Sequence, residues 1–298
     1  MRLLTIFTPS YNRAHTLGRL YESLAAQSDM RFEWVVVDDG STDGTAELLK
    51  GFKKTAPFSV TVITKENGGK PAAINDGLRA ARGEFFFMLD SDDYLSEDGV
   101  EKLFRWCEEI EGDGSFVGVG AAKAYIGGTY IKGVPPKVGE GGYVDATNLE
   151  RRLYDLDADM CEAYKTEIFR RFPFVTWEGE RFVPEQIVLN EMALAGYRLR
   201  WHKDIIYYCE YLEGGLTRDS RLLVKQNPMG YAMMYGHMTR YGLGFGKSFK
   251  CAMNMVALSV CGGHPFYFLK SDRRGLAALA FLPGLLLSIR RRRQFKRI

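Results

Sequence analysis

The chain has 298 residues, of which 46% are hydrophobic, so it can bury a full core as one large domain or as one domain with an extension. This composition excludes an intrinsically disordered chain. The 40 basic and 37 acidic residues nearly balance, so we expect no nucleic-acid partner. The five cysteines form no CxxC pair and no zinc-like spacing, which predicts a reducing, cytoplasmic location and no disulfide framework.

Apolar runs and helical spacings alternate along the first hundred residues. The first run breaks at Pro9 without a signal-peptide cleavage site, so it is interpreted as a strand. Strands are predicted at residues 3–7, 32–40, 58–64 and 84–89, and helices at residues 15–28, 45–52 and 71–81. Alternation with nearly continuous Val, Ile, Leu and Phe strands predicts an α/β fold, with a mostly parallel central sheet flanked by helices.

Polar residues follow three of these strands, at positions 8–12, 38–41 and 90–93. Ligands bind outside the carboxyl ends of strands in such sheets, so we expect the three clusters to form one site. The last cluster, Asp-Ser-Asp-Asp, places three carboxylates together, and carboxylates are costly to bury unless a cation compensates them. A divalent metal site is one interpretation, and a solvated acidic turn that caps the next helix is the other.

The middle of the chain has a different composition. Residues 112–148 are rich in Gly and Pro, which predicts irregular hairpins and loops beside the site. Helical spacing returns near residue 183 and ends at Gly196, and a late strand is predicted at residues 204–212. From about residue 221, Met and aromatic residues interleave with Gly. We therefore predict one domain over residues 1–220 and a helical extension over residues 221–298.

The C-terminal segment combines an apolar run with a basic tail. The apolar run at residues 275–289 is too short to span a bilayer, which takes roughly 20 residues, and Pro283 interrupts it. Six basic residues lie within residues 290–298. This pattern favours a helix in the membrane interface with its cations on anionic lipid, which would place the protein peripherally on the inner face of the cell membrane. The alternative is a packed C-terminal helix followed by solvated charges.

Three segments together resemble glycosyltransferase family 2, which has the GT-A fold: "FTPSYNRAHTLGRLYESLAAQS", "FEWVVVDDGSTDGT" and "KENGGKPAAINDGLRAARGEFFFMLDSDDYL". The resemblance covers residues 3–95 in order and spacing. It implies an inverting, metal-dependent transfer of a sugar from a nucleotide-sugar donor to a hydroxyl of a glycan or lipid-linked acceptor. The basic tail and the habit of this family suggest the synthesis of a bacterial surface polysaccharide.

The resemblance also assigns the acidic cluster. Asp90-Ser91-Asp92 is similar to the DXD motif of the family, in which Asp92 would hold Mn²⁺ or Mg²⁺ and Asp90 would lie near the ribose or a metal-bound water. Ser91 belongs to the same nucleotide-binding motif. Asp93 would be an outer-shell or helix-capping residue. Oxygen ligands suit both metals, which bind through one or two carboxylates plus phosphates.

The nucleoside is expected at the ends of the first two strands. One of Asp38 and Asp39 would accept a hydrogen bond from the base, which favours uracil or thymine and so a UDP-sugar, although guanine also offers N–H donors. Residues 67–70 match the loop of the family before the third helix, from which Lys70 can reach base or phosphate. The remaining nucleoside contacts implied by the resemblance are Thr8, Pro9 and Tyr11.

The resemblance also implies an acidic base that deprotonates the acceptor hydroxyl, within an "ED" pair that opens a helix. This chain departs from the pair, because Gln186 follows Glu185 where the family has Asp. Glu185 is the first candidate and Glu180 the second. A purely structural role for Glu185 at the N-terminus of a helix is the alternative, since an acidic side chain there is favourable to the helix dipole.

Two other functions remain open at this point. A sugar-1-phosphate nucleotidyltransferase uses a similar sheet and metal, but it has a Gly-rich GxGTR-type loop after the first strand, where this chain has "TPSYNR". A non-catalytic partner subunit that binds a nucleotide sugar is the second alternative, and Gln186 is the residue that favours it.

Overall fold

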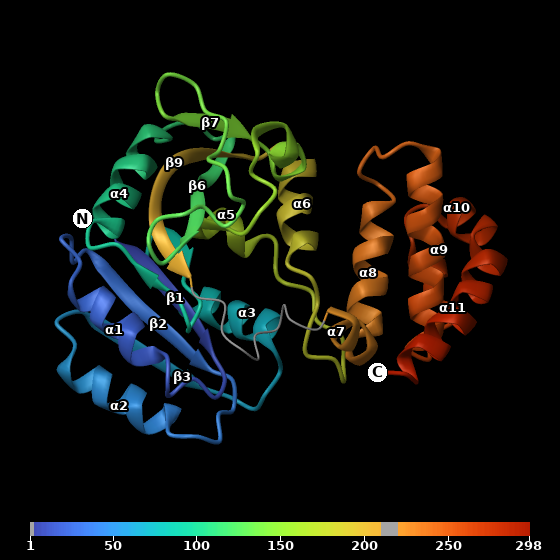
Figure 1. Cartoon of the computed structure of the whole chain (residues 1–298), viewed down its shortest axis with the longest axis horizontal. Helices are drawn as coiled ribbons and strands as arrows, with labels where there is room; N and C mark the ends of the chain where they lie inside the picture. The colour runs from blue at the N-terminus through green and yellow to red at the C-terminus, as the bar shows by residue number, and fades with distance from the viewer. Residues whose placement is uncertain (1–2, 210–219) are drawn as a thin grey trace. The chain divides into compact units, whose positions relative to one another are not determined.

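The computed structural model describes residues 3–209 and 220–298 (Figure 1). The chain forms two compact units. The first unit consists of Met1–Pro173 and Leu189–Tyr211, and the second consists of Phe174–Val188 and Leu212–Ile298. Residues 174–188, which the predicted boundary at residue 220 assigned to the first domain, belong to the second unit. The association of residues 221–298 with a membrane remains a prediction.

The described strands of the first unit form a single nine-stranded sheet. Its strands are β1 (Leu4–Ser10), β2 (Phe32–Asp38), β3 (Ser59–Thr64), β4 (Phe85–Met88), β5 (Tyr94–Leu95), β6 (Phe116–Tyr125), β7 (Tyr143–Ala146), β8 (Met160–Lys165) and β9 (Arg198–Cys209). The order is β3-β2-β1-β4-β8-β6-β9-β5, and β7 pairs with β9. Strands β3, β2, β1 and β4 are parallel neighbours, which confirms the predicted α/β architecture. Antiparallel pairing of β8 with β4 and β6 extends the sheet.

Helices cover both faces of the sheet in the first unit (Figure 1). One face packs against α1 (Leu17–Ala25), α2 (Thr45–Thr55) and α4 (Gly99–Glu109), whose leucines join Trp34 and Val36 in one buried cluster. On the opposite face, α3 (Lys70–Ala80) lies against Phe7, and α5 (Thr166–Arg170) brings Phe169 against Phe86. A 3₁₀ helix covers Asn148–Tyr154, and α6 covers Gln186–Leu194. Because helices cover both faces of the sheet, β1, β2 and β4 are buried along almost their whole length, which explains why so few of their residues are polar.

The prediction of irregular structure over residues 112–148 was wrong for β6. This strand is ten residues long and almost completely buried. Its glycines are there because neighbours come close: a Cβ on Gly118 would lie 2.1 Å from the carbonyl oxygen of Ala163, and one on Gly120 would lie 2.7 Å from the ring of Trp201. The late strand was predicted at residues 204–212, but β9 already begins at Arg198, and residues 210–212 lie outside the described residues.

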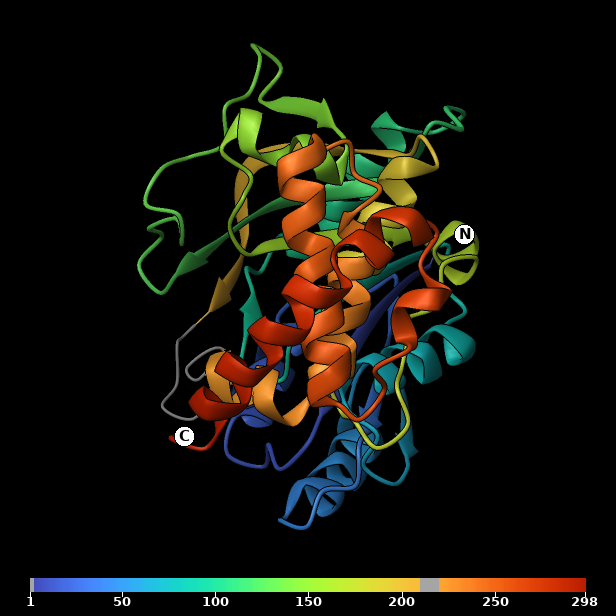
Figure 2. The ribbon, with the colours of Figure 1, turned by 90° about the vertical axis from the view of Figure 1, so that its right-hand side faces the viewer.

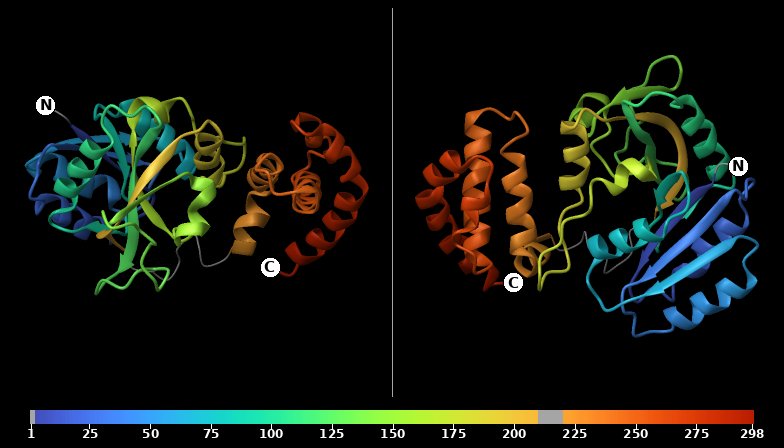
Figure 3. Two further views of the ribbon diagram at one scale, coloured as in Figure 1. Left: turned by 90° about the horizontal axis from the view of Figure 1, so that it is seen from above. Right: turned by 180° about the vertical axis from the view of Figure 1, so that it is seen from behind.

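The described helices of the second unit are α7 (Ser220–Gln226), α8 (Pro228–Met238), α9 (Phe245–Cys261), α10 (Arg274–Leu279) and α11 (Phe281–Phe295), with a 3₁₀ turn at Tyr267–Lys270. Helix α9 packs between α8 and α11, as the rotated views show (Figures 2 and 3). At Gly284 the backbone of α11 lies directly against Val256. Val183 and Ile187 from the first segment of this unit join Met233 in a separate apolar cluster.

The apolar run at residues 275–289 forms two helices, α10 and α11, which meet at Ala280. Pro283 lies in the first turn of α11, where a missing backbone N–H costs little, so it does not interrupt that helix. None of the described helices has both the length and the apolar character needed to cross a membrane.

Candidate active site

The acidic cluster lies in a tight turn directly after β4. Backbone N–H of Asp93 donates to the carbonyl oxygen of Asp90 at 3.1 Å, and the turn leads into β5. Ser91 and Asp93 are buried, whereas Asp90 and Asp92 are partly exposed. The turn is therefore not a solvated cap. Helix α4 begins only at Gly99, so the expectation that Asp93 caps a helix was wrong.

Two lysines compensate this cluster. Lys70 Nζ lies 2.8 Å from Asp90 Oδ1, and Lys123 Nζ lies 3.4 Å from Asp90 Oδ2 and 3.8 Å from Asp93 Oδ2. Burial raises the pKa of the Asp90 carboxyl, but the ammonium groups of Lys70 and Lys123 outweigh it and hold that pKa well below its ordinary value. Burial raises the pKa of Asp93 to about 7, although Lys123 opposes the shift. Asp90 is thus kept ionised by two cations.

A tyrosine closes the cluster from β9. The hydroxyl of Tyr207 accepts a hydrogen bond from the backbone N–H of Asp90 at 2.9 Å, and its ring lies 4.1 Å from Lys123 Nζ. Burial, reinforced by the negative charges of Asp90 and Asp93, raises the pKa of Tyr207 well above its ordinary value. Tyr207 therefore remains a neutral phenol that packs the lysine against the turn.

The metal implied by the family needs oxygen ligands. Among the residues that the structure describes, no group of three or more histidine, cysteine or carboxylate side chains is arranged to hold a metal. Mg²⁺ and Mn²⁺ differ from structural metals in that they accept one or two carboxylates and complete their shell with phosphate oxygens and water. A partly exposed Asp92 beside Asp90 fits that requirement, with Asp92 the freer of the two for a metal because both Asp90 oxygens already face lysines.

The second cluster, after β2, organises a loop. Asp39 accepts hydrogen bonds from the backbone N–H groups of Gly68 and Gly69, at 2.9 and 2.7 Å, and from Lys65 Nζ at 2.9 Å. Asp38 accepts a hydrogen bond from the backbone N–H of Ser41 at 3.1 Å. Most acceptor positions of Asp39 are therefore used inside the protein. Its contact with a base remains a prediction, and its observed role is to hold the loop that leads to α3.

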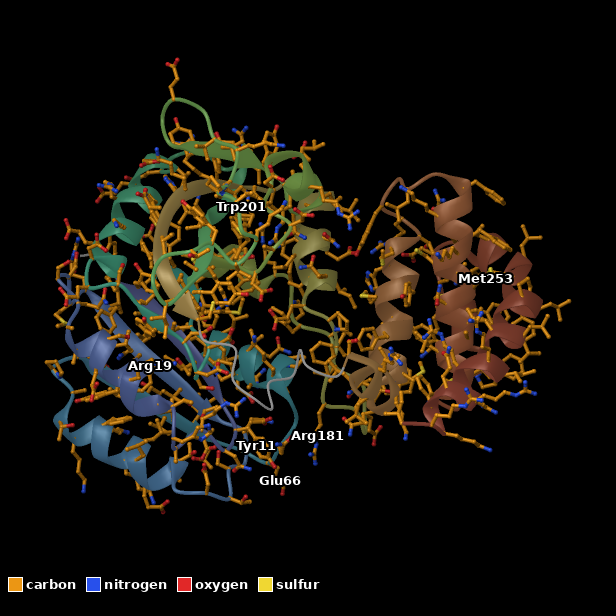
Figure 4. All side chains as sticks on the ribbon, in the orientation of Figure 1. Tyr11, Arg19, Glu66, Arg181, Trp201 and Met253 are labelled. Atoms are coloured by element: carbon orange, nitrogen blue, oxygen red, sulfur yellow. The ribbon has the colours of Figure 1, made fainter. Side chains whose placement is uncertain are left out.

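The first cluster, after β1, lies beside that loop. Thr8 is buried and its hydroxyl accepts a hydrogen bond from Trp34 Nε1 at 3.0 Å, whereas the side chain of Tyr11 is 43% exposed. Pro9 pairs with Val37 in β2. Figure 4 labels Tyr11 after β1 and Glu66 in the loop that Asp39 holds. The structure thus brings the ends of β1, β2 and β4 to one edge of the sheet, as predicted from their order.

Four residues of this site were missed by sequence reasoning: Ser10, Asn67, Lys123 and Tyr207. Within the described part of the chain, Ser10 Oγ and Asn67 Oδ1 are buried without a hydrogen-bond partner. Because buried polar atoms are rarely left unpaired, these two point to a polar ligand at the ends of β1 and β2. Ser10 lies inside the predicted cluster at residues 8–12 and Asn67 inside the predicted loop at residues 67–70, so these two motifs could have indicated both residues. Nothing in the sequence near Lys123 or Tyr207 marks either residue.

The two candidate bases belong to the second unit. Glu180 accepts hydrogen bonds from the backbone N–H groups of Met229 and Gly230, both at 2.7 Å, and so caps the N-terminus of α8. Burial raises the pKa of Glu180, which these two backbone donors oppose. Glu185 immediately precedes α6, and the backbone N–H of Val188 donates to its carbonyl oxygen at 3.0 Å.

Comparison with known proteins identifies the family. The model of the family "Glycosyl transferase family 2" matches residues 5–169, which include every residue of the acidic cluster. Glycosyltransferase GlyA of Streptococcus pneumoniae is 27% identical over 66% of this chain and 30% of its own length. Poly(ribitol-phosphate) beta-N-acetylglucosaminyltransferase TarS of Staphylococcus aureus is 26% identical over 70% of this chain and 35% of its own length. The chain thus matches less than half the length of these relatives.

Solved structures support the fold. S. aureus TarS 1–349, in complex with UDP-GlcNAc, superposes with a TM-score of 0.63 at 20% identity, over 95% of this chain and 81% of that one. Mannosyltransferase PcManGT from Pyrobaculum calidifontis, in complex with GDP-Man and Mn²⁺, superposes with a TM-score of 0.54 at 18% identity, over 98% of this chain and 83% of that one. With a family model that covers more than half of its residues and a matching fold, the chain belongs to glycosyltransferase family 2.

Proposed function

We propose that the protein is an inverting glycosyltransferase that moves a sugar from a UDP-sugar to a hydroxyl of a glycan or lipid-linked acceptor. The observation that supports this most directly is the joining of Asp90, Asp92 and Lys70 at the sheet edge where Asp39 holds the 65–69 loop. Carboxylates for a metal and an ammonium group for phosphate are what a nucleoside diphosphate requires. The known relatives include bacterial cell-wall polymer transferases, which favours a bacterial surface polysaccharide as the product.

The donor would bind along the carboxyl ends of β1, β2 and β4. Ser10 Oγ and Asn67 Oδ1 are the buried atoms that could contact its nucleoside, together with Thr8, Pro9 and Tyr11. Uracil is our choice of base, because the TarS structure contains UDP-GlcNAc, although the PcManGT structure contains GDP-Man. Asp92, with Asp90, would hold Mn²⁺ or Mg²⁺, which when bound neutralises the charge on the departing diphosphate.

We propose Glu185 as the base that deprotonates the acceptor. The proposal depends on the position of this residue before α6 in a chain that belongs to the family. Glu180 is the weaker candidate, since both of its carboxylate oxygens accept backbone hydrogen bonds that begin α8.

We also propose that the second unit binds an anionic membrane surface at the cytoplasmic leaflet. Leu282, Leu286 and Ile289 on α11 have 69%, 70% and 48% of their surface exposed. Their spacing of four and three residues puts them on one face of the helix, opposite the buried Gly284 and Ser288.

Two arginines of the basic tail also have partners inside the second unit. Arg291 donates to Asn254 Oδ1 and Arg292 donates to the carbonyl oxygen of Val260, so both are tied to α9. Arg290 and Arg293 are exposed beside the apolar face, and the contact of the basic tail with lipid remains a prediction. An exposed apolar stripe bordered by cations suits an anionic lipid surface.

The donor class can be identified by thermal shift. Purified protein is heated with UDP, GDP, dTDP or CDP, each with and without Mn²⁺, and we expect a Mn²⁺-dependent increase in melting temperature with UDP. A ligand at a hundred times its Kd stabilises by about 2.7 kcal/mol. In Asp92→Asn the shift should lose its dependence on Mn²⁺. Glu47→Gln, which removes a carboxylate with 74% of its surface exposed, is the matched control and should behave as the parent protein.

The same samples distinguish the alternatives. Folded protein that shifts with none of the four diphosphates would contradict a competent donor site. A UDP-dependent shift without hydrolysis or transfer of UDP-sugars, tested with acceptors of several classes, would favour a non-catalytic subunit that binds nucleotide sugars.

A further inference from the structure

Lys123 is a buried cation behind the acidic turn. It extends from β6, and only 12% of its side chain is exposed. Its ammonium group faces Asp90 Oδ2 at 3.4 Å, Asp93 Oδ2 at 3.8 Å and the ring of Tyr207 at 4.1 Å. A buried ammonium group is expensive unless it is paired, so the two carboxylates and this lysine stabilise one another.

The second lysine of the cluster is held differently. Lys70 stands at the first position of α3, after the glycines of the loop, and 26% of its side chain is exposed. Its ammonium group is therefore more accessible than that of Lys123 to a phosphate at the ends of the strands. Lys123 is fixed by a central strand and packed against Tyr207, so its charge stays beside Asp90 and Asp93 whatever binds at Asp92.

The charges of the cluster determine what it attracts. Three carboxylates (Asp90, Asp92 and Asp93) and two ammonium groups (Lys70 and Lys123) leave at most one net negative charge. That charge is small for a divalent cation that arrives alone, since the cation is also repelled by the fixed ammonium group. A nucleoside diphosphate adds the negative charge that the cluster lacks.

We propose that Lys123 is a positioning residue that makes binding of the divalent cation depend on the nucleoside diphosphate. The proposal relies on the proposed donor function and deepens it, because it assigns a role to a residue outside the motifs. Lys123 acts through Asp90 and Asp93, which it holds in place, and through its charge, which weakens the site for the metal alone.

The test measures Mn²⁺ binding, not activity. Free Mn²⁺ is counted by its electron paramagnetic resonance signal, with and without saturating UDP, in the parent protein, Lys123→Met and Lys123→Arg. We expect the parent to bind Mn²⁺ at least about tenfold more tightly with UDP than without it, a difference of about 1.4 kcal/mol. Lys123→Met should bind Mn²⁺ alone about tenfold more tightly than the parent, and Lys123→Arg should retain the parent behaviour.

A double variant separates charge from damage to the fold. At pH 8, where Asp93 with its pKa of about 7 is largely ionised, Lys123→Met combined with Asp93→Asn removes one charge of each sign, so we expect its affinity for Mn²⁺ alone to return to the parent value. Circular dichroism reports whether each variant is folded. If Lys123→Met is unfolded, Asp93→Asn alone decides the matter: a charge effect predicts that it binds Mn²⁺ alone more weakly than the double variant does, and equal affinity of the two would contradict the inference.

Other outcomes overturn the inference. A folded Lys123→Met that binds Mn²⁺ alone no more tightly than the parent would contradict it, as would a parent protein whose Mn²⁺ affinity does not change with UDP. Calorimetric titration of UDP into the parent identifies the separate case in which the proposed donor function fails. The comparison of parent and Lys123→Met with Mn²⁺ alone needs no nucleotide, so it still decides the effect of the lysine charge.

Discussion

Several buried polar side chains of the first unit have partners that are distant in the sequence. Glu33 is fully buried on β2, and its carboxylate accepts hydrogen bonds from Thr5 Oγ1 at 2.7 Å and from the backbone N–H of Arg82 at 2.6 Å. In the same way, Asp90 has a partner that is distant in the sequence, Lys123. Residue types alone indicate that such groups need partners, but the fold decides which partners they have.

His202 is a buried histidine whose ionisation should affect stability. Its ring stacks on Trp106 with centroids 4.3 Å apart, only 4% of the residue is exposed, and Nε2 lies 3.5 Å from Glu109 Oε2. Burial, together with the positive charges of Arg200 and Arg105, lowers its pKa to about 3. The unfolded chain takes up this proton near pH 6.5, so the folded state loses stability as the pH falls below that value.

We expect this one group to remove about 2 kcal/mol of stability between pH 7 and pH 5. His202→Phe can keep the stacking but cannot take up this proton. Its free energy of unfolding should therefore fall by about 2 kcal/mol less between pH 7 and pH 5 than that of the parent protein. Urea denaturation followed by tryptophan fluorescence at both pH values measures the difference. His15→Gln, at an exposed histidine, is the control, and equal pH dependence in all three proteins would refute the prediction.

At the scale of elements, the sequence predicted the helices and strands whose pattern of apolar residues is set by the local sequence. The parallel strands β1 to β4 are continuous apolar runs, and the helices between them show clear 3.6-residue spacing, so the edge where the motifs meet could be predicted. Strand β6 could not be predicted, because Gly118 and Gly120 are required by close neighbours in β8 and β9 that the local sequence does not show. Lys123 was missed with it, since a lone lysine in a predicted loop gives no signal.

Helix α3 packs on β1 through a glycine that tertiary contact requires. A Cβ on Gly77 would lie 2.3 Å from two ring atoms of Phe7, a fully buried residue that stacks on Phe86. Gly51 in α2 is exposed and has nothing within 4 Å of the same position. The two glycines are therefore a matched pair, in which only one is needed for packing.

We expect Gly77→Ala to destabilise the protein by about 1–3 kcal/mol, because the ring of Phe7 has no room to move in the core. Gly51→Ala should instead stabilise it by about 0.5–1 kcal/mol through the better helix propensity of alanine. Denaturant unfolding of both variants measures the two effects. The packing argument fails if both alanines change stability in the same direction and by the same amount.

At the scale of the whole molecule, the proposed membrane surface is confined to the second unit. Vesicles of neutral phosphatidylcholine and vesicles with added phosphatidylglycerol are sedimented with the protein, and we expect more to sediment with the anionic ones. Leu282→Ser combined with Leu286→Ser should abolish most of that binding, since the apolar stripe is lost. Leu153→Ser, at a leucine of the first unit with 66% of its surface exposed, is the control. Equal sedimentation of all three proteins would contradict the proposal.

The position of β9 in the chain has a consequence for biosynthesis. This strand completes the first unit by pairing with β6 and β5, yet it is synthesised after residues 174–188, which belong to the second unit. A nascent chain that ends before Arg198 leaves one edge of the long, apolar β6 uncovered, and it lacks the Tyr207 hydroxyl that fixes Asp90. Although all motifs of the donor site leave the ribosome early, the site is complete only after Cys209 has emerged.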